Sequence, residues 1–227
     1  MTMIYVTGDM HADIDINKFS SGKFPQGKTL TKDDYVIVCG DFGLCWDGSS
    51  RETWWRKWLS SKPWTTLFVD GNHENFDMLF QLPEREMFGN RVREVAPSIF
   101  YLPRGEVFTI EDKTFFTFGG ARSHDREYRK ENVSWWPQEM PTYQEMCHGI
   151  DSLDDVDWKV DYVLTHCAPT DVQSKIRSWY ESDDLTQFFN RVYPDLSFRK
   201  WFFGHYHVDQ TLDDGFACLY HDIKRIA

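Results

Sequence analysis

The sequence predicts an α/β fold built on mixed β-sheet. Short runs rich in β-branched and aromatic residues recur along the 227-residue chain, and Gly, Asp, Asn or His closes each of them. Such runs are typical of strands buried on both faces of a sheet. Amphipathic helical patterns fill the intervals between the runs, and a β-hairpin pattern lies near the middle of the chain. Helical crossovers combined with hairpins indicate a mixture of parallel and antiparallel pairing.

The buried strands are expected at five places: residues 3–7, 35–39, 66–69, 162–165 and 201–203. The hairpin pairs residues 107–110 with 114–118 around Glu111-Asp112-Lys113, because two alternating segments flank a short polar turn. A last strand pair, 208–212 with 217–220, is expected around Asp213-Asp214-Gly215.

Three helices follow from their start signals and apolar spacing. Capping-box patterns at Ser49-x-x-Glu52 and Thr142-x-x-Glu145 mark the starts of two of them, and the third runs from about 183 to 192. Tryptophans of the first helix have helical spacing and are expected to pack into the core rather than form a stacking platform: Trp54, Trp55 and Trp58.

The length fits a single domain spanning residues 1–227. The segment 122–141 is the one irregular region, and it is expected to be an inserted loop or lid that contributes to specificity. Two interpretations of its aromatic residues Trp135 and Trp136 stay open. They stack on a nucleobase of the substrate, or they seal the lid against the domain.

Charge and composition exclude several classes of protein. The formal net charge of −11 argues against general binding of nucleic acids or anionic membranes, which clustered Lys and Arg mediate. No apolar stretch is long enough to span a bilayer, and the N-terminus lacks the pattern of a signal peptide. Five cysteines without a CxxC pair fit reduced thiols. A cytoplasmic location is expected.

Five of the eight histidines come immediately after predicted strands, beside Gly, Asp or Asn. The carboxyl ends of neighbouring parallel strands open on one crevice, so these side chains are expected to meet there. The motifs, in chain order, are Asp9-x-His11, Gly40-Asp41-Phe42-Gly43, Gly71-Asn72-His73-Glu74, Thr165-His166 and Gly204-His205-x-His207.

Carboxylate, imidazole and amide oxygen together suit divalent metals such as manganese, iron, zinc, nickel or cobalt. The set holds more ligands than one tetrahedral ion uses, which indicates two ions about 3.5–4 Å apart that share a carboxylate. Asp41 is the expected bridging ligand.

These motifs, in this order over residues 8–207, resemble those of the calcineurin-like metallophosphoesterase superfamily. The resemblance implies a four-layer α/β/β/α sandwich with two mixed β-sheets and a dinuclear metal site at the carboxyl ends of the strands. It also implies the ligands: Asp9, His11 and His207 for the first ion, Asn72, His166 and His205 for the second, and Asp41 between them. His73 resembles the acid of the second coordination sphere.

The expected activity is metal-dependent hydrolysis of a phosphate ester by a metal-bridging hydroxide. Asp41 and His73 are the expected catalytic residues, because a histidine can stabilise the developing charge or protonate the leaving group. Asn72, His73 and Arg122 are the expected contacts to substrate. Two divalent ions are the expected cofactors, manganese first, and Glu74 or another carboxylate is expected to orient His73.

Three histidines match none of the motifs: His124, His148 and His221. His148 and His221 are interpreted as surface or partly buried residues. His124 is left open, because the segment that contains it leaves a predicted strand toward the crevice. In the same segment Arg122 or Arg126 could hold a substrate phosphate.

The substrate class stays open between a phosphomonoester, a phosphodiester and a nucleotide. A nuclease, a serine/threonine protein phosphatase of the same superfamily and a catalytically silent scaffold are the alternatives. Ala12 and Leu44 depart from the patterns of phosphoprotein phosphatases and purple acid phosphatases respectively, which disfavours those two subclasses. The retained His73 and full ligand set argue against a silent scaffold.

Overall fold

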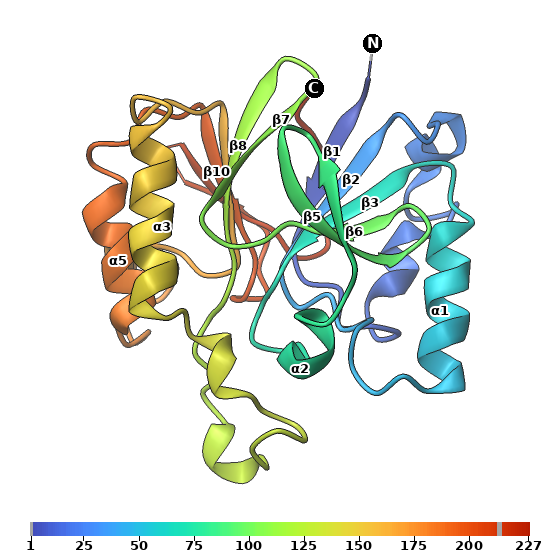
Figure 1. Ribbon diagram of the computed structural model, residues 1–227, viewed down its shortest axis with the longest axis horizontal. Coiled ribbons are helices and arrows are strands. Elements are labelled where there is room, and N and C mark those ends of the chain that lie inside the picture. The colour runs from blue at the N-terminus through green and yellow to red at the C-terminus, as the bar shows by residue number, and fades with distance from the viewer. Residues whose placement is uncertain (1, 213–214) are drawn as a thin grey trace.

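Two mixed β-sheets form the centre of the protein in this computed structural model, which describes residues 2–212 and 215–227 (Figure 1). The first sheet has the strand order β13 (Lys224–Arg225), β1 (Ile4–Thr7), β2 (Tyr35–Cys39), β3 (Thr65–Val69), β6 (Ile99–Tyr101), β5 (Asn90–Ala96), β4 (Glu84–Met87). The second has the order β11 (Gln210–Thr211), β12 (Phe216–Cys218), β10 (Lys200–Phe203), β9 (Tyr162–Thr165), β8 (Lys113–Phe118), β7 (Glu106–Ile110). Strands β1, β2, β3 and β6 pair in parallel, as do β8, β9, β10 and β12, and antiparallel strands complete both sheets.

Helices cover the outer face of each sheet, as Figure 1 shows. The helices on the side of the first sheet are α1 (Ser50–Ser60), α2 (Phe76–Leu79) and the 3-10 helices η1 (Ile16–Phe19) and η2 (Pro25–Thr29). Those on the side of the second sheet are α3 (Tyr143–Asp154), α4 (Thr170–Ile176) and α5 (Asp184–Val192). The resulting α/β fold with two mixed sheets is the one that the sequence predicted.

Three hydrophobic clusters hold these layers together, and the strands divide their side chains between them by alternation. In β2, Val36 and Val38 face the cluster under α1, whereas Ile37 and Cys39 face the cluster between the two sheets. In β10, Trp201 and Phe203 face the cluster under α3 and α5. Because both faces of these strands are buried, their sequences are continuously apolar, which made them recognisable.

The five predicted buried strands are confirmed as β1, β2, β3, β9 and β10. The predicted hairpin is confirmed as β7 and β8, and the last predicted pair as the shorter β11 and β12. Asp213 and Asp214, placed in the turn of that last pair, lie outside the described residues. The three predicted helices are confirmed as α1, α3 and α5.

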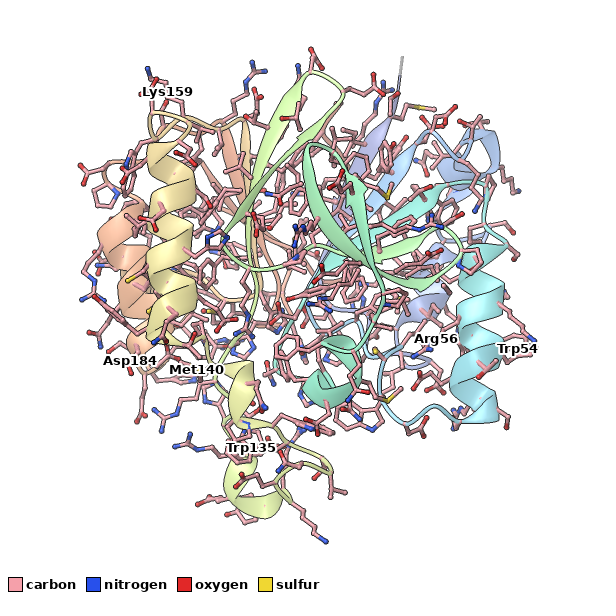
Figure 2. All side chains as sticks on the ribbon, viewed as in Figure 1. Trp54, Arg56, Trp135, Met140, Lys159 and Asp184 are labelled. Carbon is pink, nitrogen blue, oxygen red and sulfur yellow. The ribbon has the colours of Figure 1, made fainter. Side chains whose placement is uncertain are left out.

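The expectation for Trp54 is wrong. This side chain is 55% exposed and points away from the sheets, as Figure 2 shows, whereas Trp55 and Trp58 pack partly against the core. The helix presents one stripe to the sheet, and Trp54 falls outside that stripe because neighbouring positions differ by 100° around an α-helix.

The segment 122–141 is irregular, as expected. It is described throughout and forms only two short 3-10 helices, η3 (Arg126–Tyr128) and η4 (Pro137–Glu139). It projects from the body of the molecule at the bottom of Figure 1, below α2. Trp136 is 2% exposed and donates a hydrogen bond from Nε1 to Asp77 Oδ2, so this tryptophan seals the segment against the domain.

Among the described residues, no helix combines the length and apolar character needed to cross a membrane. The five cysteines are free thiols, and four of them are buried.

Candidate metal centre

Five loops converge at the carboxyl ends of β1, β2, β3, β9 and β10, and they bring the predicted ligands together. Within residues 2–212 and 215–227, three groups of side chains have their ligand atoms within 4.8 Å of one another: Asp9, His11 and His207; His11, Asp41 and His73; Asp9, Asp41 and His166. The groups share members, so they form one continuous centre. Asn72 and His205 join it through His166: the Asn72 Oδ1 atom lies 3.2 Å from His166 Nε2, and the His205 ring lies 5.0 Å from the His166 ring.

The backbone at these loops is strained. Asp41 has a φ of 46°, and His11, His205 and His207 also have positive φ values, at 46°, 68° and 51°. Non-glycine residues rarely adopt this left-handed conformation, and clusters of them occur at functional sites. The tight turns let each loop leave its strand and aim a polar side chain into the crevice at once.

Glycines beside the ligands leave the space that these side chains occupy. A Cβ atom added at Gly71 would collide with Oδ1 of Asp41, and one added at Gly204 would collide with Oδ1 of Asp9. The glycines in the motifs therefore have a steric reason, which is the close approach of one loop to the ligand of another.

Asp41 occupies the middle of the centre, with its two oxygens directed at different groups. Oδ2 lies 3.2 Å from His11 Nε2, while Oδ1 lies 3.3 Å from His166 Nε2 and accepts a hydrogen bond of 2.8 Å from the backbone N–H of His73. A carboxylate that faces histidines on both sides has the arrangement that a bridging ligand requires.

Asp9 offers a buried oxygen with no hydrogen-bond donor. Its Oδ1 accepts a hydrogen bond of 2.8 Å from the backbone N–H of His205. Its Oδ2 is buried and accepts no hydrogen bond from the described residues, although His207 Nε2 lies 3.0 Å away. A buried carboxylate oxygen without a donor is costly, and a cation would remove that cost. The site therefore fits divalent metal ions.

Hydrogen bonds outside the centre fix the imidazole rings. His166 Nδ1 lies 2.8 Å from the carbonyl oxygen of Cys39, so Nδ1 carries the proton and Nε2 is left for a metal. His11 Nδ1 lies 2.8 Å from Asp15 Oδ2, which similarly directs Nε2 toward the crevice. Partners of this kind are typical of metal-binding histidines. Asp15 was missed from the sequence, although its spacing of four residues from His11 is a signal for it.

The acidic charge of Asp9 and Asp41 governs the ionisation of these histidines. Burial lowers the pKa of His166, but Asp41 and Asp9 raise it more, to about 10. Burial also lowers the pKa of His11, and Asp41 raises it to about 9. For His205, desolvation and the charge of His166 lower the pKa to about 3. Without metal, the two raised histidines carry the positive charge that balances the carboxylates.

His73 faces a different partner from the one that was expected. Glu74 is buried, and its carboxylate accepts hydrogen bonds from the backbone N–H groups of Phe42 and Gly43, at 2.6 and 3.2 Å. It braces the loop that follows Asp41 instead of orienting His73. The His73 ring lies against Arg129, whose Nη1 and Nη2 atoms are 3.1 and 3.4 Å from Nδ1 and Nε2.

Arg122 is not a member of the three metal-ligand groups found among the described residues. It lines a cavity of about 240 Å³ with Ser123, His124, Arg126 and Asp183, among others. His124, the histidine left open by the sequence, stacks on His205 with 5.7 Å between ring centroids and 28° between planes. Arg129 was missed because nothing in the sequence distinguishes it from its charged neighbours in the insert.

Comparison with known proteins agrees with this geometry. The family model described as "Calcineurin-like phosphoesterase" matches residues 2–209. The chain is 26% identical over 185 residues to the lariat debranching enzyme of Danio rerio, and 26% identical over 188 residues to lariat debranching enzyme A of Xenopus laevis. These matches cover 73% and 74% of the chain but only 31% and 33% of the two relatives, so the chain spans about a third of their length.

One solved structure superposes over nearly the whole length of both proteins. It covers 99% of this chain and 98% of its own chain, with a TM-score of 0.55 and 10% sequence identity. At that identity the likeness supports the fold and carries no statement about the substrate.

Proposed function

The chain belongs to the calcineurin-like phosphoesterase family, and we propose that it is a phosphoric ester hydrolase that cleaves a small phosphate ester with two divalent metal ions, manganese first. The observation that carries the proposal is the position of Asp41, with one oxygen toward His11 and the other toward His166. One ion would be held by Asp9, His11 and His207, on the Oδ2 side of the Asp41 carboxylate. The other would be held by Asn72, His166 and His205, on its Oδ1 side.

When bound, the ions polarise the phosphoryl oxygens and lower the pKa of water enough to supply hydroxide at neutral pH. The residues of the chain place the ester and manage its charge. His73 stands beside His11 and Asp41, with 5.6 Å between the His73 and His11 rings. From there it can donate a proton to the leaving oxygen or stabilise the charge that develops on it.

Arg129 is a further group for the phosphate. Its guanidinium lies against the His73 ring and is held by Asp125, with 2.7 Å between Arg129 Nε and Asp125 Oδ1. Arginine presents several donors in a plane and suits phosphate oxygens. We assign to Arg129 the contact with substrate that the sequence had suggested for Arg122. The insert at 122–141 thereby acts as part of the binding site.

The experiment is a hydrolysis assay across metals. Protein stripped with chelator and resupplied with manganese should cleave p-nitrophenyl phosphate or bis(p-nitrophenyl) phosphate, and the ratio of the two rates gives the preference for mono- or diesters. The same protein without metal should be inactive. Failure to cleave either ester with any first-row divalent metal would refute the proposal.

A nucleic-acid substrate is the second candidate, because the two relatives are named lariat debranching enzymes. The net charge of −11 opposes it, since extended phosphate backbones are held by clustered cations. Incubation with linear and branched RNA and single- and double-stranded DNA, followed by gel electrophoresis, separates the two candidates.

A further inference from the structure

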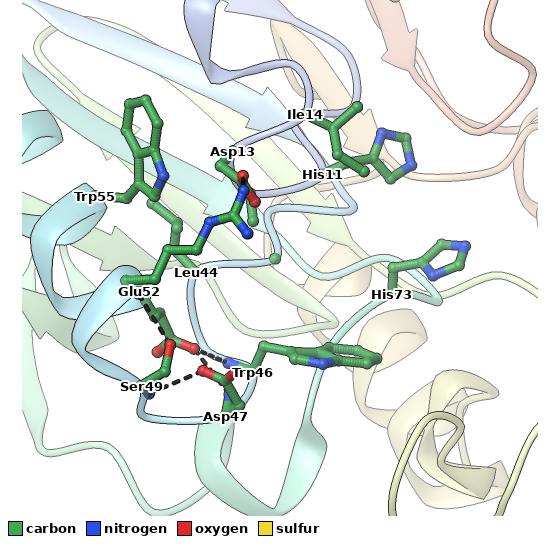
Figure 3. A pocket seen from close by; sticks show the side chains of 13 residues that line it. His11, Asp13, Ile14, Leu44, Trp46, Asp47, Ser49, Glu52, Trp55 and His73 are labelled. Atoms are coloured by element: carbon green, nitrogen blue, oxygen red, sulfur yellow. Dashed lines mark hydrogen bonds and ion pairs between the residues drawn. The ribbon is translucent and has the colours of Figure 1, made fainter.

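A cavity of about 290 Å³ opens beside His11 and His73, and it shares no lining residue with the cavity of His124 and Arg122. Figure 3 shows it from close by, with the two histidines at one end and Trp55 at the other. The walls come from the loops after β1 and β2 and from the start of α1. Its volume is close to the lower end of the range of small-molecule sites, roughly 300 Å³.

Buried polar groups hold the loop that forms one wall. Glu52 is 6% exposed, and its Oε2 accepts hydrogen bonds from the backbone N–H groups of Trp46 and Asp47, both at 2.8 Å. Arg56 donates a hydrogen bond of 2.6 Å to the carbonyl oxygen of Leu44 and pairs with Glu52. The wall is therefore formed before any ligand arrives, which reduces the entropy that binding must overcome.

Trp46 presents its indole to this cavity. In Figure 3 its side chain extends from the loop toward His73. The ring of Trp136 packs edge-on against it, with 5.2 Å between centroids and 77° between planes. Trp136 is itself fixed by its hydrogen bond to Asp77. The insert therefore supports one side of the Trp46 ring, and the other side of the ring faces the cavity.

The remaining lining combines apolar surface with acidic groups. Leu44, Ile14 and Trp55 supply the apolar part, while Asp13 and Asp47 supply carboxylates. Arg51 pairs with Asp13 at the rim. A flat apolar wall with carboxylate acceptors beside it suits a planar aromatic ring that carries N–H donors, and it disfavours a second phosphate or carboxylate.

We propose that this cavity is the subsite for the organic group of the ester, and that it takes a planar nitrogen-containing ring such as a nucleobase stacked on Trp46. The inference rests on the proposed function, since the phosphate is placed at the neighbouring metal centre. The aromatic residue expected to contact the substrate is then Trp46, in the loop after β2, and not Trp136 of the insert, which is buried.

The test compares adenosine 5′-monophosphate with ribose 5-phosphate, which carries a hydroxyl group at C1 in place of the base. Manganese-loaded wild-type protein should show a KM for the nucleotide about tenfold lower than for the sugar phosphate, the size expected for stacking of one base. Trp46→Ala should abolish that difference and leave the KM for ribose 5-phosphate unchanged. Trp46→Phe should retain most of it, because phenylalanine keeps an aromatic face.

Trp179→Ala is the matched control, since Trp179 is 67% exposed and does not line the cavity. It should behave as wild type with both esters. An equal rise in the KM values of both substrates in Trp46→Ala, or no change in either KM, would refute the proposed subsite. Unchanged thermal unfolding of Trp46→Ala would show that the fold is kept.

Failure of the proposed function gives a different result. If wild-type protein hydrolyses neither ester, both ligands remain intact and their binding can be measured by equilibrium dialysis. Weaker binding of adenosine 5′-monophosphate to Trp46→Ala than to wild type, with ribose 5-phosphate unaffected, would still support the subsite. Equal binding to both proteins would refute it.

Discussion

Asn72 donates a hydrogen bond of 3.2 Å from its side-chain Nδ2 to Ser123 Oγ. Because the amide nitrogen is engaged there, the amide oxygen is turned toward His166 and the metal centre. Ser123 in turn donates to Glu139 Oε2 at 2.5 Å, and its backbone N–H donates to Glu139 Oε1 at 2.9 Å. The insert therefore decides which end of the Asn72 amide faces a cation.

Removal of the Ser123 hydroxyl should weaken metal binding. In Ser123→Ala the amide of Asn72 loses the acceptor that fixes its orientation, and loss of such a partner typically costs about 10–100-fold in metal affinity or activity. Manganese titration of the chelator-stripped protein measures this loss of metal affinity. Ser178→Ala, at an exposed serine, should bind metal as wild type does. Equal affinities in the two variants would contradict the role of Ser123.

Gly204 should tolerate no side chain. An alanine Cβ there would collide with Oδ1 of Asp9, so the ligand or the loop must move. Overpacking of this kind costs about 1–3 kcal/mol in stability, and Gly204→Ala should also lose metal. Gly22→Ala is the control, because a Cβ at Gly22 meets nothing within 4 Å. Thermal unfolding and metal content measure the two effects, and wild-type metal content in Gly204→Ala would contradict the steric argument.

Substitution of Asp41 should abolish metal binding, whereas substitution of His73 should reduce mainly turnover. Asp41→Ala removes the carboxylate shared by the two sides of the centre and should abolish metal occupancy and activity together. His73→Ala should keep the metals and lose mainly kcat, with little change in KM, because its proposed interaction is with the transition state. Metal analysis beside steady-state kinetics measures both. Loss of metal from His73→Ala would instead make His73 a ligand, as its group with His11 and Asp41 allows.

The predicted ligands were recognisable because metal-binding side chain types occur in them at the ends of predicted strands. Each lies within a few residues of the end of an apolar strand, and four of them directly follow a glycine: Asp9, Asp41, Asn72 and His205. Parallel strands must bring such positions to one edge. Arg129 and Glu139 carry no comparable signal. They belong to an irregular insert whose path depends on tertiary contacts, such as the hydrogen bond of 2.9 Å from Arg104 Nη2 to the carbonyl oxygen of Gln138.

The same contrast explains which strands were predicted from the sequence and which were missed. Strands buried on both faces, such as β2, were predicted with the observed bounds, whereas β4, β5 and β6 were missed. The four residues of β4 are exposed or half-buried, and β5 buries fully only Val92. The side chains of β4 and β5 lack an apolar pattern, and β6 is apolar and buried but only three residues long. The pairing of β4 and β5 depends on the sheet edge that β3 provides through β6.

Arg129 should matter for substrate and Arg126 should not. Arg129→Met removes the guanidinium beside His73, and loss of a charged hydrogen bond of roughly 1.5–3 kcal/mol lowers kcat/KM by about 10–100-fold. Arg126→Met is the matched change at an exposed arginine of the same insert, and it should retain wild-type kcat/KM. A loss of the same size in both variants would indicate a general effect of the insert's charge rather than a contact by Arg129.

Metal affinity should rise with pH through the neutral range. In the metal-free protein, burial lowers the pKa values of His11 and His166, but Asp41 raises them more, to about 9 and about 10. Both rings are therefore protonated at pH 7, and each must release a proton before Nε2 can bind a cation. The apparent association constant should increase about tenfold per pH unit for each proton released, and should level off above those pKa values.

Calorimetry of manganese binding at pH 6–8, in buffers of different ionisation enthalpy, measures the protons released. Asp15→Leu provides a comparison, because it removes the hydrogen bond through which Asp15 helps to raise the pKa of His11, while leaving His166 in place. That variant should release fewer protons at pH 8 than wild type. Affinity that is independent of pH between 6 and 8 would show that the histidines are already neutral before the metal arrives, and that the carboxylates face each other without their compensating charge.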